Sequence, residues 1–251
     1  MKRVLSILLS FAFLASVTGF AADETNKPVK PELPVQPADV AAPKLAPDGS
    51  IQAGFANAHE NFVNVAKKGD AQVVFLGDSI TARWNGSGKE VFKEYANYNA
   101  ANFGIGGDRV QHVLWRVENG EFDGLKPKVV VLMIGTNNAS VPENSPEQIA
   151  NGIRKIIDAI HARSANTKIL LLAIFPRGAT PAKRVKNEAV NAIIAKYDDG
   201  KTVHYLNINT KFLTADGTLE KTIMPDLLHP NAAGYQIEAD AIREKLASLV
   251  K

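Results

Sequence analysis

The sequence predicts an α/β fold: a three-layer α/β/α sandwich built around a sheet of about five parallel strands. Short apolar runs alternate along the chain with segments of helical periodicity, which is the order expected when helices link parallel strands. The apolar runs are continuous rather than alternating, so we expect helices to cover both faces of the sheet. Several runs end directly at Gly or Pro, which marks the end of a strand.

The individual elements follow from the same pattern. The clearest strands are the apolar runs at 73–76, 129–134 and 169–175, and weaker candidates lie at 98–103 and 203–208. Helical periodicity covers the segments at 55–67, 110–117, 149–161, 182–197 and 232–250. Ser145 followed by Pro146 is typical of a helix cap and first turn. Ligands of such sheets bind beyond the carboxyl ends of the strands, so the loops that follow the strands are the places to search for function.

The composition excludes several classes of protein. With 45% apolar and 22% charged residues, the chain has the make-up of an ordinary globular protein. A net charge of +3 is too small to indicate a nucleic-acid partner. The absence of Cys excludes disulfides, thiolate catalysis, Cys-based zinc sites and iron–sulfur clusters.

The N-terminus is typical of a secretory signal peptide at 1–21. Lys2 and Arg3 precede an apolar stretch at 4–15, and Gly19 and Ala21 are the small residues that a signal peptidase reads. The alternative is a membrane anchor, but hydroxyl residues interrupt a stretch that falls short of the about 20 apolar residues needed to span a bilayer. Cleavage after Ala21 would take the net charge from +3 to +1. We therefore expect a secreted or periplasmic protein without stable membrane insertion, and the lack of Cys excludes a bacterial lipoprotein.

A proline-rich segment at 22–49 follows the signal. Its spacing favours extended polyproline conformation, which cannot bury a core; the prolines are Pro28, Pro31, Pro34, Pro37, Pro43 and Pro47. We predict a linker, with a docking ligand for a partner as the alternative. The remaining chain, 50–251, is expected to form one folded domain.

Ser79 is the first candidate catalytic residue. It follows the strand at 73–76 in the block Gly77-Asp78-Ser79-Ile80, at the start of a helical segment. A Ser in this position presents its hydroxyl at the carboxyl edge of the sheet, where the helix N-terminus favours developing negative charge. The alternative is a simple helix cap behind a turn glycine.

His229 is the His that the secondary structure does not explain. It lies in a Pro-bounded loop before the last helix, whereas the other four His residues fall within helical or strand patterns. Asp226 precedes it by three residues, so one loop can turn both side chains the same way. The carboxylate could then orient the imidazole while the other ring nitrogen faces a serine hydroxyl. A metal site is a weaker alternative, because two ligands are too few.

Two further loops could hold a developing oxyanion, which needs positioned hydrogen-bond donors. The block 104–108 reads Gly-Ile-Gly-Gly-Asp, and its glycines allow the backbone to approach a substrate closely. It is not a dinucleotide-binding fingerprint, because Arg109 stands where the third Gly would be. The block 135–138 reads Gly-Thr-Asn-Asn and offers side-chain amides. Each block alone could be ordinary turn chemistry, but all of them at successive functional loops point to a catalytic site.

Together these blocks resemble the GDSL/SGNH hydrolase superfamily. The resemblance covers nearly the whole folded domain and rests on Gly77-Asp78-Ser79, Gly104-Ile105-Gly106-Gly107-Asp108, Gly135-Thr136-Asn137-Asn138 and Asp226-Leu227-Leu228-His229-Pro230. Longer stretches resemble the branch related to platelet-activating factor acetylhydrolase catalytic subunits, at 102–108, 112–116, 126–130 and 176–178. Ile80 stands where the superfamily name has Leu, a conservative apolar change.

The resemblance implies a flavodoxin-like sheet and a role for each matching residue. Ser79 would be the nucleophile, His229 the base and Asp226 its orienting carboxylate. The N–H groups of Ser79 and Gly107 and the side-chain amide of Asn137 would form the oxyanion hole. The enzyme would need no metal or cofactor. The branch includes dimers, so a homodimer stays open.

The implied activity is hydrolysis of carboxylic esters by a secreted serine enzyme. Nothing in the sequence resembles a hydrophobic lid for long acyl chains, and aromatic residues make up only 7% of the chain. We therefore expect short acyl groups, acetyl above all, on O-acetylated carbohydrates, and Arg109 beside the glycine block could influence substrate choice. The alternatives are a lipid acetylhydrolase or lysophospholipase, and an inactive carbohydrate-binding module of the same fold.

Overall fold

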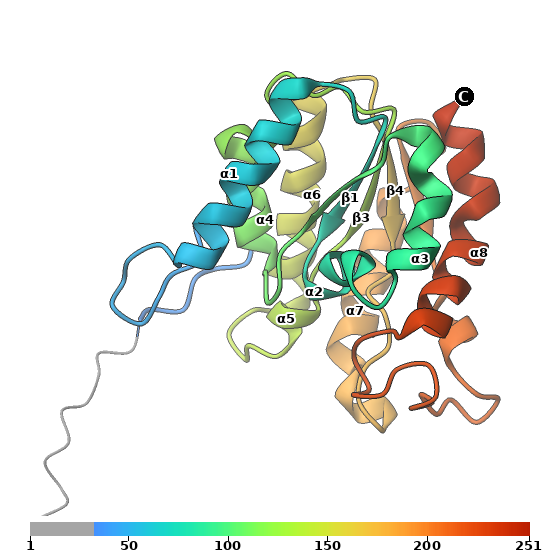
Figure 1. Ribbon diagram of the computed structural model, residues 1–251. Coiled ribbons are helices and arrows are strands. Elements are labelled where there is room, and N and C mark those ends of the chain that lie inside the picture. Colours follow the sequence, from blue (N-terminus) through green and yellow to red (C-terminus); the bar gives the residue numbers. More distant parts are fainter. Residues whose placement is uncertain (1–32) are drawn as a thin grey trace, which may run out of the picture. The chain divides into compact units, whose positions relative to one another are not determined.

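Five parallel strands lie at the centre of the protein in the computed structural model, which describes residues 33–251 (Figure 1). The strands are β1 (Val73–Gly77), β2 (Ala101–Gly104), β3 (Val129–Met133), β4 (Lys168–Leu172) and β5 (Val203–Leu206). They lie in the order β2-β1-β3-β4-β5, and every neighbouring pair is parallel. The predicted fold class is therefore confirmed. The predicted signal peptide at 1–21 lies outside the described residues.

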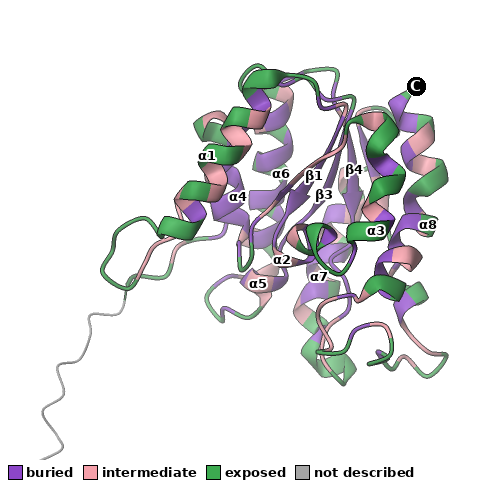
Figure 2. Ribbon diagram, in the orientation of Figure 1, coloured by how far each residue is buried: buried purple, intermediate pink, exposed green. Residues whose placement is uncertain are grey.

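Helices cover both faces of this sheet, as Figures 1 and 2 show. The longer helices are α1 (Ala53–Lys68), α4 (Val110–Arg116), α6 (Pro146–Arg163), α7 (Val185–Ile194) and α8 (Ala232–Val250). The short ones are α2 (Ser79–Ala82), α3 (Lys89–Phe92) and α5 (Thr136–Ala139). Helices α1, α4, α6 and α7 contribute to the core on one face, whereas α3 and α8 contribute to the core on the other.

The continuous apolar strands supply both cores at once. Along β1, Val74 and Leu76 pack into the core beneath α4 and α6, while Val73 and Phe75 pack into the core beneath α8. Strands β3 and β4 divide their residues between the two cores in the same alternating way. This alternation is the direct consequence of side chains that point to opposite faces along a strand.

The helix boundaries differ from the predicted ones where local turns intervene. Helix α6 begins at Pro146 because the Ser145 side chain accepts a hydrogen bond from the N–H of Gln148 and the Gln148 side chain accepts one from Ser145. Helix α7 is shorter than predicted, since 181–183 and 195–197 are 3₁₀ turns. The segment 93–98 is also 3₁₀, so β2 starts only at Ala101. None of the helices within 33–251 has the length and apolar character needed to cross a membrane.

Residues 33–49, here called the N-terminal strap, pack against the domain instead of forming a free linker. Ala38 is fully buried in the core beside α6. The groove that receives it exists because residue 152 is Gly: a Cβ there would lie 2.4 Å from the Ala38 carbonyl oxygen. The linker predicted at 22–49 is therefore corrected for 33–49, and residues 22–32 lie outside the described part of the chain.

Candidate active site

The turn that carries Ser79 joins β1 to α2. Asp78 caps the helix, with its Oδ1 accepting a hydrogen bond from the N–H of Ile80 at 3.0 Å. Gly77 is required by the tight packing of this turn, since a Cβ there would lie 2.3 Å from the Met133 carbonyl oxygen. Ser79 is the first residue of α2, so its N–H has no intrahelical acceptor and is available to a ligand.

The structure brings Ser79, His229 and Asp226 together. The Oγ of Ser79 lies 2.8 Å from Nε2 of His229, and Nδ1 of His229 lies 2.6 Å from Oδ2 of Asp226. Because the carboxylate accepts, Nδ1 carries the proton, and Nε2 is left to accept from the serine hydroxyl. This is the geometry of a nucleophile, a base and an orienting carboxylate.

The loop that carries Asp226 and His229 is folded around the carboxylate. Oδ1 of Asp226 accepts the backbone N–H of His229 at 2.7 Å and that of Leu228 at 3.1 Å. Leu227 adopts a left-handed backbone with φ of 56°, an uncommon conformation for a residue other than glycine, which indicates that the loop is constrained. Burial disfavours ionisation of Asp226, but the hydrogen bonds from His229 outweigh it and lower the pKa of the carboxyl.

The glycine block after β2 lies against the turn that carries Ser79. The N–H of Ile105 donates to the Gly77 carbonyl at 3.3 Å. Gly104 must lack a side chain, because a Cβ would lie 2.1 Å from the Ala82 nitrogen. Gly107 has a φ of 72°, which favours glycine. The predicted oxyanion loop is thus packed directly against the turn that carries the predicted nucleophile.

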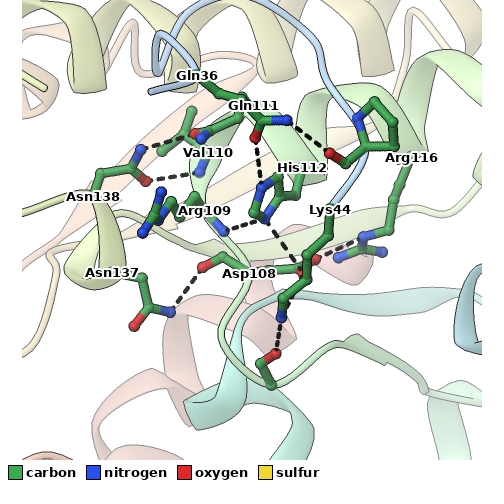
Figure 3. Close-up of polar contacts among 12 residues, drawn as sticks. Gln36, Lys44, Asp108, Arg109, Val110, Gln111, His112, Arg116, Asn137 and Asn138 are labelled. Atoms are coloured by element: carbon green, nitrogen blue, oxygen red, sulfur yellow. Dashed lines mark hydrogen bonds and ion pairs between the residues drawn. The ribbon is translucent and has the colours of Figure 1, made fainter. Parts of the chain in front are cut away.

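Asn137 and Asn138 of helix α5 have different tasks. The side-chain amide of Asn137 donates to the Asp108 carbonyl at 2.8 Å, which leaves its second proton free to donate (Figure 3). Asn138 is fully buried and structural: it accepts the Val110 N–H at 2.8 Å and donates to Gln111. The structure therefore places Asn137, not Asn138, at the oxyanion loop, and the catalytic roles themselves stay predictions.

Arg177 fixes helix α5, a contact that sequence reasoning missed. Its guanidinium donates to the Thr136 carbonyl at 2.8 Å and to the Ser140 hydroxyl at 2.9 Å. These residues begin and end the single turn that carries Asn137. Arg177 falls in the stretch 176–178 of the family resemblance, but nothing in the sequence indicates what its side chain contacts.

A buried group of charges supports the oxyanion loop from below, and sequence reasoning missed it as well. Arg116 is fully buried; its Nε donates to Oδ2 of Asp108 at 3.0 Å, and a second nitrogen donates to Glu121. The same guanidinium donates to the Phe103 carbonyl at 3.1 Å and to the Gly77 carbonyl at 3.4 Å, so it ties together the ends of β2 and β1.

Two buried carboxyls near the site have raised pKa values. Burial raises the pKa of Asp108 to about 6, although Arg116 and Lys44 favour its ionised form. Burial also raises the pKa of Asp78 to about 7, with the Ile80 N–H opposing the shift. Both shifts are opposite in sign to that of Asp226, which lies half-exposed.

The rim of the site carries positive charge and an apolar wall. Nη1 of Arg83 lies 3.9 Å from Oδ2 of Asp226, an exposed pair that contributes little to stability. A cavity of about 390 Å³ opens between the strap and the oxyanion loop. Gly107 and Arg109 line it on one side, and the strap lines it with apolar residues, among them Leu33, Val35 and Leu45.

Comparison with known proteins finds proteins of similar sequence. The model of the GDSL-like lipase/acylhydrolase family matches residues 75–237. Among curated proteins, the human platelet-activating factor acetylhydrolase IB subunit alpha1 is 36% identical over 195 residues, covering 76% of this chain and 82% of its own. The mouse alpha2 subunit is 35% identical over 214 residues, covering 84% and 91%.

A solved structure shows the same fold. The GDSL-like lipase from Bacteroides thetaiotaomicron superposes with a TM-score of 0.63 at 21% identity, covering 76% of this chain and 97% of that protein. All the residues predicted for the site fall within the span that the family model matches, 75–237. The strap precedes that span.

Proposed function

This chain belongs to the GDSL-like lipase/acylhydrolase family and is a serine ester hydrolase, and from this premise we propose that it removes acetyl and other short acyl groups from O-acetylated carbohydrates outside the cytoplasm. The observation that carries the chemistry is the chain of contacts from Ser79 to His229 to Asp226 at 2.8 and 2.6 Å. The acetyl preference is supported by the names of the curated relatives, which are acetylhydrolase subunits.

The proposed reaction follows from the protonation states at the site. The Nε2 of His229 takes the proton of Ser79 as the hydroxyl oxygen attacks the ester carbonyl, and Asp226 stabilises the imidazolium. The N–H groups of Ser79 and Gly107, with the free amide proton of Asn137, hold the oxyanion. The alcohol leaves with the proton from His229. Water then attacks the acyl-serine by the same route and releases the acid.

Export is part of the proposal and rests on the sequence at 1–21, with its positive start, apolar stretch and small residues before the cut. An exported esterase meets acetylated polysaccharide directly. Secretion of the expressed protein, with a mature N-terminus at Ala22, would support this step. A retained N-terminus would contradict it.

A lipid ester is the second candidate, because one observation favours it. The strap lines the cavity beside Gly107 with apolar side chains, and Leu33 and Val35 remain exposed there. An apolar acyl chain or alkyl group that covered them would stabilise the bound complex, because apolar surface would be removed from water. The inactive binding module is not retained, since the chain is an enzyme by family and fills every triad position.

The decisive experiment is acetate release from acetylated xylan, simple sugar acetates and a short-chain phospholipid, measured side by side. We expect the carbohydrate esters to be preferred, and a series of nitrophenyl esters to peak at short acyl chains. A peak at eight carbons or more, or preference for the phospholipid, would contradict the proposed substrate. The Ser79→Ala variant is the control, and it should lose both activity and labelling by a fluorophosphonate probe.

A further inference from the structure

Lys44, on the N-terminal strap, reaches the oxyanion loop from outside the family match. Its Nζ donates to the Gly106 carbonyl oxygen at 2.5 Å, and Oδ1 of Asp108 lies 3.9 Å away (Figure 3). The side chain is mostly buried, with 18% of its surface exposed. Lys44 therefore crosses from one segment to another that is 62 residues away in the sequence.

The carbonyl that Lys44 binds belongs to the peptide unit whose N–H is the predicted oxyanion donor. A peptide unit is planar and trans, so the carbonyl of Gly106 and the N–H of Gly107 point in opposite directions. A cation on the carbonyl oxygen fixes the plane of this unit and polarises it, which strengthens the N–H as a donor. Within residues 33–251 the Gly107 N–H donates to no other protein group.

We propose that Lys44 is a positioning residue for the oxyanion hole, which it sets by holding the Gly106–Gly107 peptide from behind. The proposal rests on the proposed function, since it assigns the Gly107 N–H to the oxyanion. It also gives the strap a part in positioning the oxyanion hole, because the strap supplies the cation that binds the Gly106 carbonyl.

The strap is anchored on both sides of Lys44, so the ammonium group is held in place. The Ala42 N–H donates to the Gln111 carbonyl at 3.2 Å, and the Lys44 carbonyl accepts the Gln52 N–H at 2.8 Å. Gln36 adds a contact to His112, whose Nε2 lies 3.0 Å from the Gln36 side-chain oxygen. A cation held in this way needs no reorganisation when negative charge develops.

Lys44 is the cation that contacts the Gly106 carbonyl, although Arg109 and Arg116 also lie near it. His112 accepts the Arg109 N–H through Nδ1 at 3.1 Å, so it is the neutral tautomer that donates to Gln36. Burial lowers the pKa of His112 to about 3, which excludes a second charge there. Burial lowers the pKa of Lys44 too; the Asp108 carboxylate raises it, and Arg109 and Arg116 add to the lowering. Oδ1 of Asp108 has no hydrogen-bond partner within residues 33–251 and offers its negative charge to the ammonium group.

The test replaces Lys44 and compares it with a second lysine that holds the same strap elsewhere. Lys155 donates to the Asp39 carbonyl at 2.6 Å and has no contact with the oxyanion loop, so Lys155→Met is the matched control. We expect Lys44→Met to lower kcat for nitrophenyl acetate about tenfold or more, less than the ~10²- to 10³-fold loss of a direct oxyanion donor. The KM should change little, because the contact stabilises the transition state rather than the bound substrate. Lys44→Arg should recover most of the rate.

Phenylboronic acid gives a second readout that does not depend on turnover. Its adduct with the serine places a negative oxygen in the oxyanion hole, so its affinity should fall in Lys44→Met and stay at the wild-type value in Lys155→Met. An unchanged kcat and boronate affinity in Lys44→Met would overturn the proposal. So would equal losses in both variants, which would reduce Lys44 to a strap anchor. A wild type no faster than Ser79→Ala would contradict the proposed function instead.

Discussion

The loop at 226–229 and the glycine loop at 104–108 both contribute to one predicted site but are held in opposite ways. The first is partly exposed, and its carboxylate is satisfied by hydrogen bonds from within the same loop. The second is held from outside, by Arg116 below, Asn137 beside and Lys44 behind. The predicted proton-transfer loop is thus organised mainly by its own hydrogen bonds, with one bond from the Gly178 N–H to the Leu227 carbonyl, whereas the predicted oxyanion loop depends on the tertiary fold.

The largest expected effect comes from removing the imidazole from the loop at 226–229. The His229→Ala variant should lower kcat by about 10⁴-fold or more, because the serine loses its base. Since the loop is partly exposed and folds around Asp226, the free energy of unfolding should change little. Steady-state kinetics and urea unfolding on the same samples check both statements. A large loss of stability would show that the loop is not locally organised.

Removal of Arg116 tests whether the glycine loop at 104–108 depends on the surrounding fold. The Arg116→Met variant leaves Asp108 and Glu121 buried without their partner, and we expect the free energy of unfolding to fall by about 3–5 kcal/mol. Arg154→Met is the control, because the Arg154–Asp158 pair is exposed and should contribute less than about 1 kcal/mol. Equal effects in urea unfolding would contradict the supporting role of the buried charges.

The two neighbouring amides separate catalysis from stability. Asn137→Ala should lower kcat by about 10²- to 10³-fold with little change in stability, because it removes an oxyanion donor. Asn138→Ala should instead destabilise the fold by about 1–3 kcal/mol, because it leaves buried partners unsatisfied. Kinetics and thermal melting of both variants should give opposite results. An unchanged rate in Asn137→Ala would remove it from the oxyanion hole.

The smallest effect concerns pH. Burial raises the pKa of Glu238 to about 8 from an ordinary value of 4.5, so the folded protein binds this proton more tightly than the unfolded chain. The corresponding stability is complete below pH 4.5 and is lost as the pH rises through about 8. Glu238→Gln should therefore flatten the fall of the melting temperature over this range. Asp226→Asn, whose parent pKa is lowered, should alter only the acid side of the curve. If the melting temperature of Glu238→Gln fell with pH in parallel with that of the wild type, the raised pKa of Glu238 would be contradicted.

Features that depend on neighbouring residues could be predicted from the sequence, whereas contacts between distant segments could not. The strands could be predicted because residues such as Val73 to Leu76 of β1 each face one of the two cores. Asp226 and His229 could be predicted because they lie three residues apart in one loop. The short helices α2, α3 and α5 lie below the length at which periodicity can be read. The N-terminal strap was predicted as a linker because proline spacing carries no information about a groove on the domain. That groove depends on Gly152, more than a hundred residues later in the chain.

The arrangement of Asp226 and His229 on one loop means that the triad can separate at only one joint. If the loop moves, the Nδ1–Oδ2 contact of 2.6 Å moves with it, and only the distance to Ser79, 150 residues away, changes. The imidazole of His229 would thus keep its tautomer when its distance to Ser79 changes. We expect the proton between Nδ1 of His229 and the Asp226 carboxylate to be observable by NMR even after Ser79 is replaced, because that contact lies within one loop.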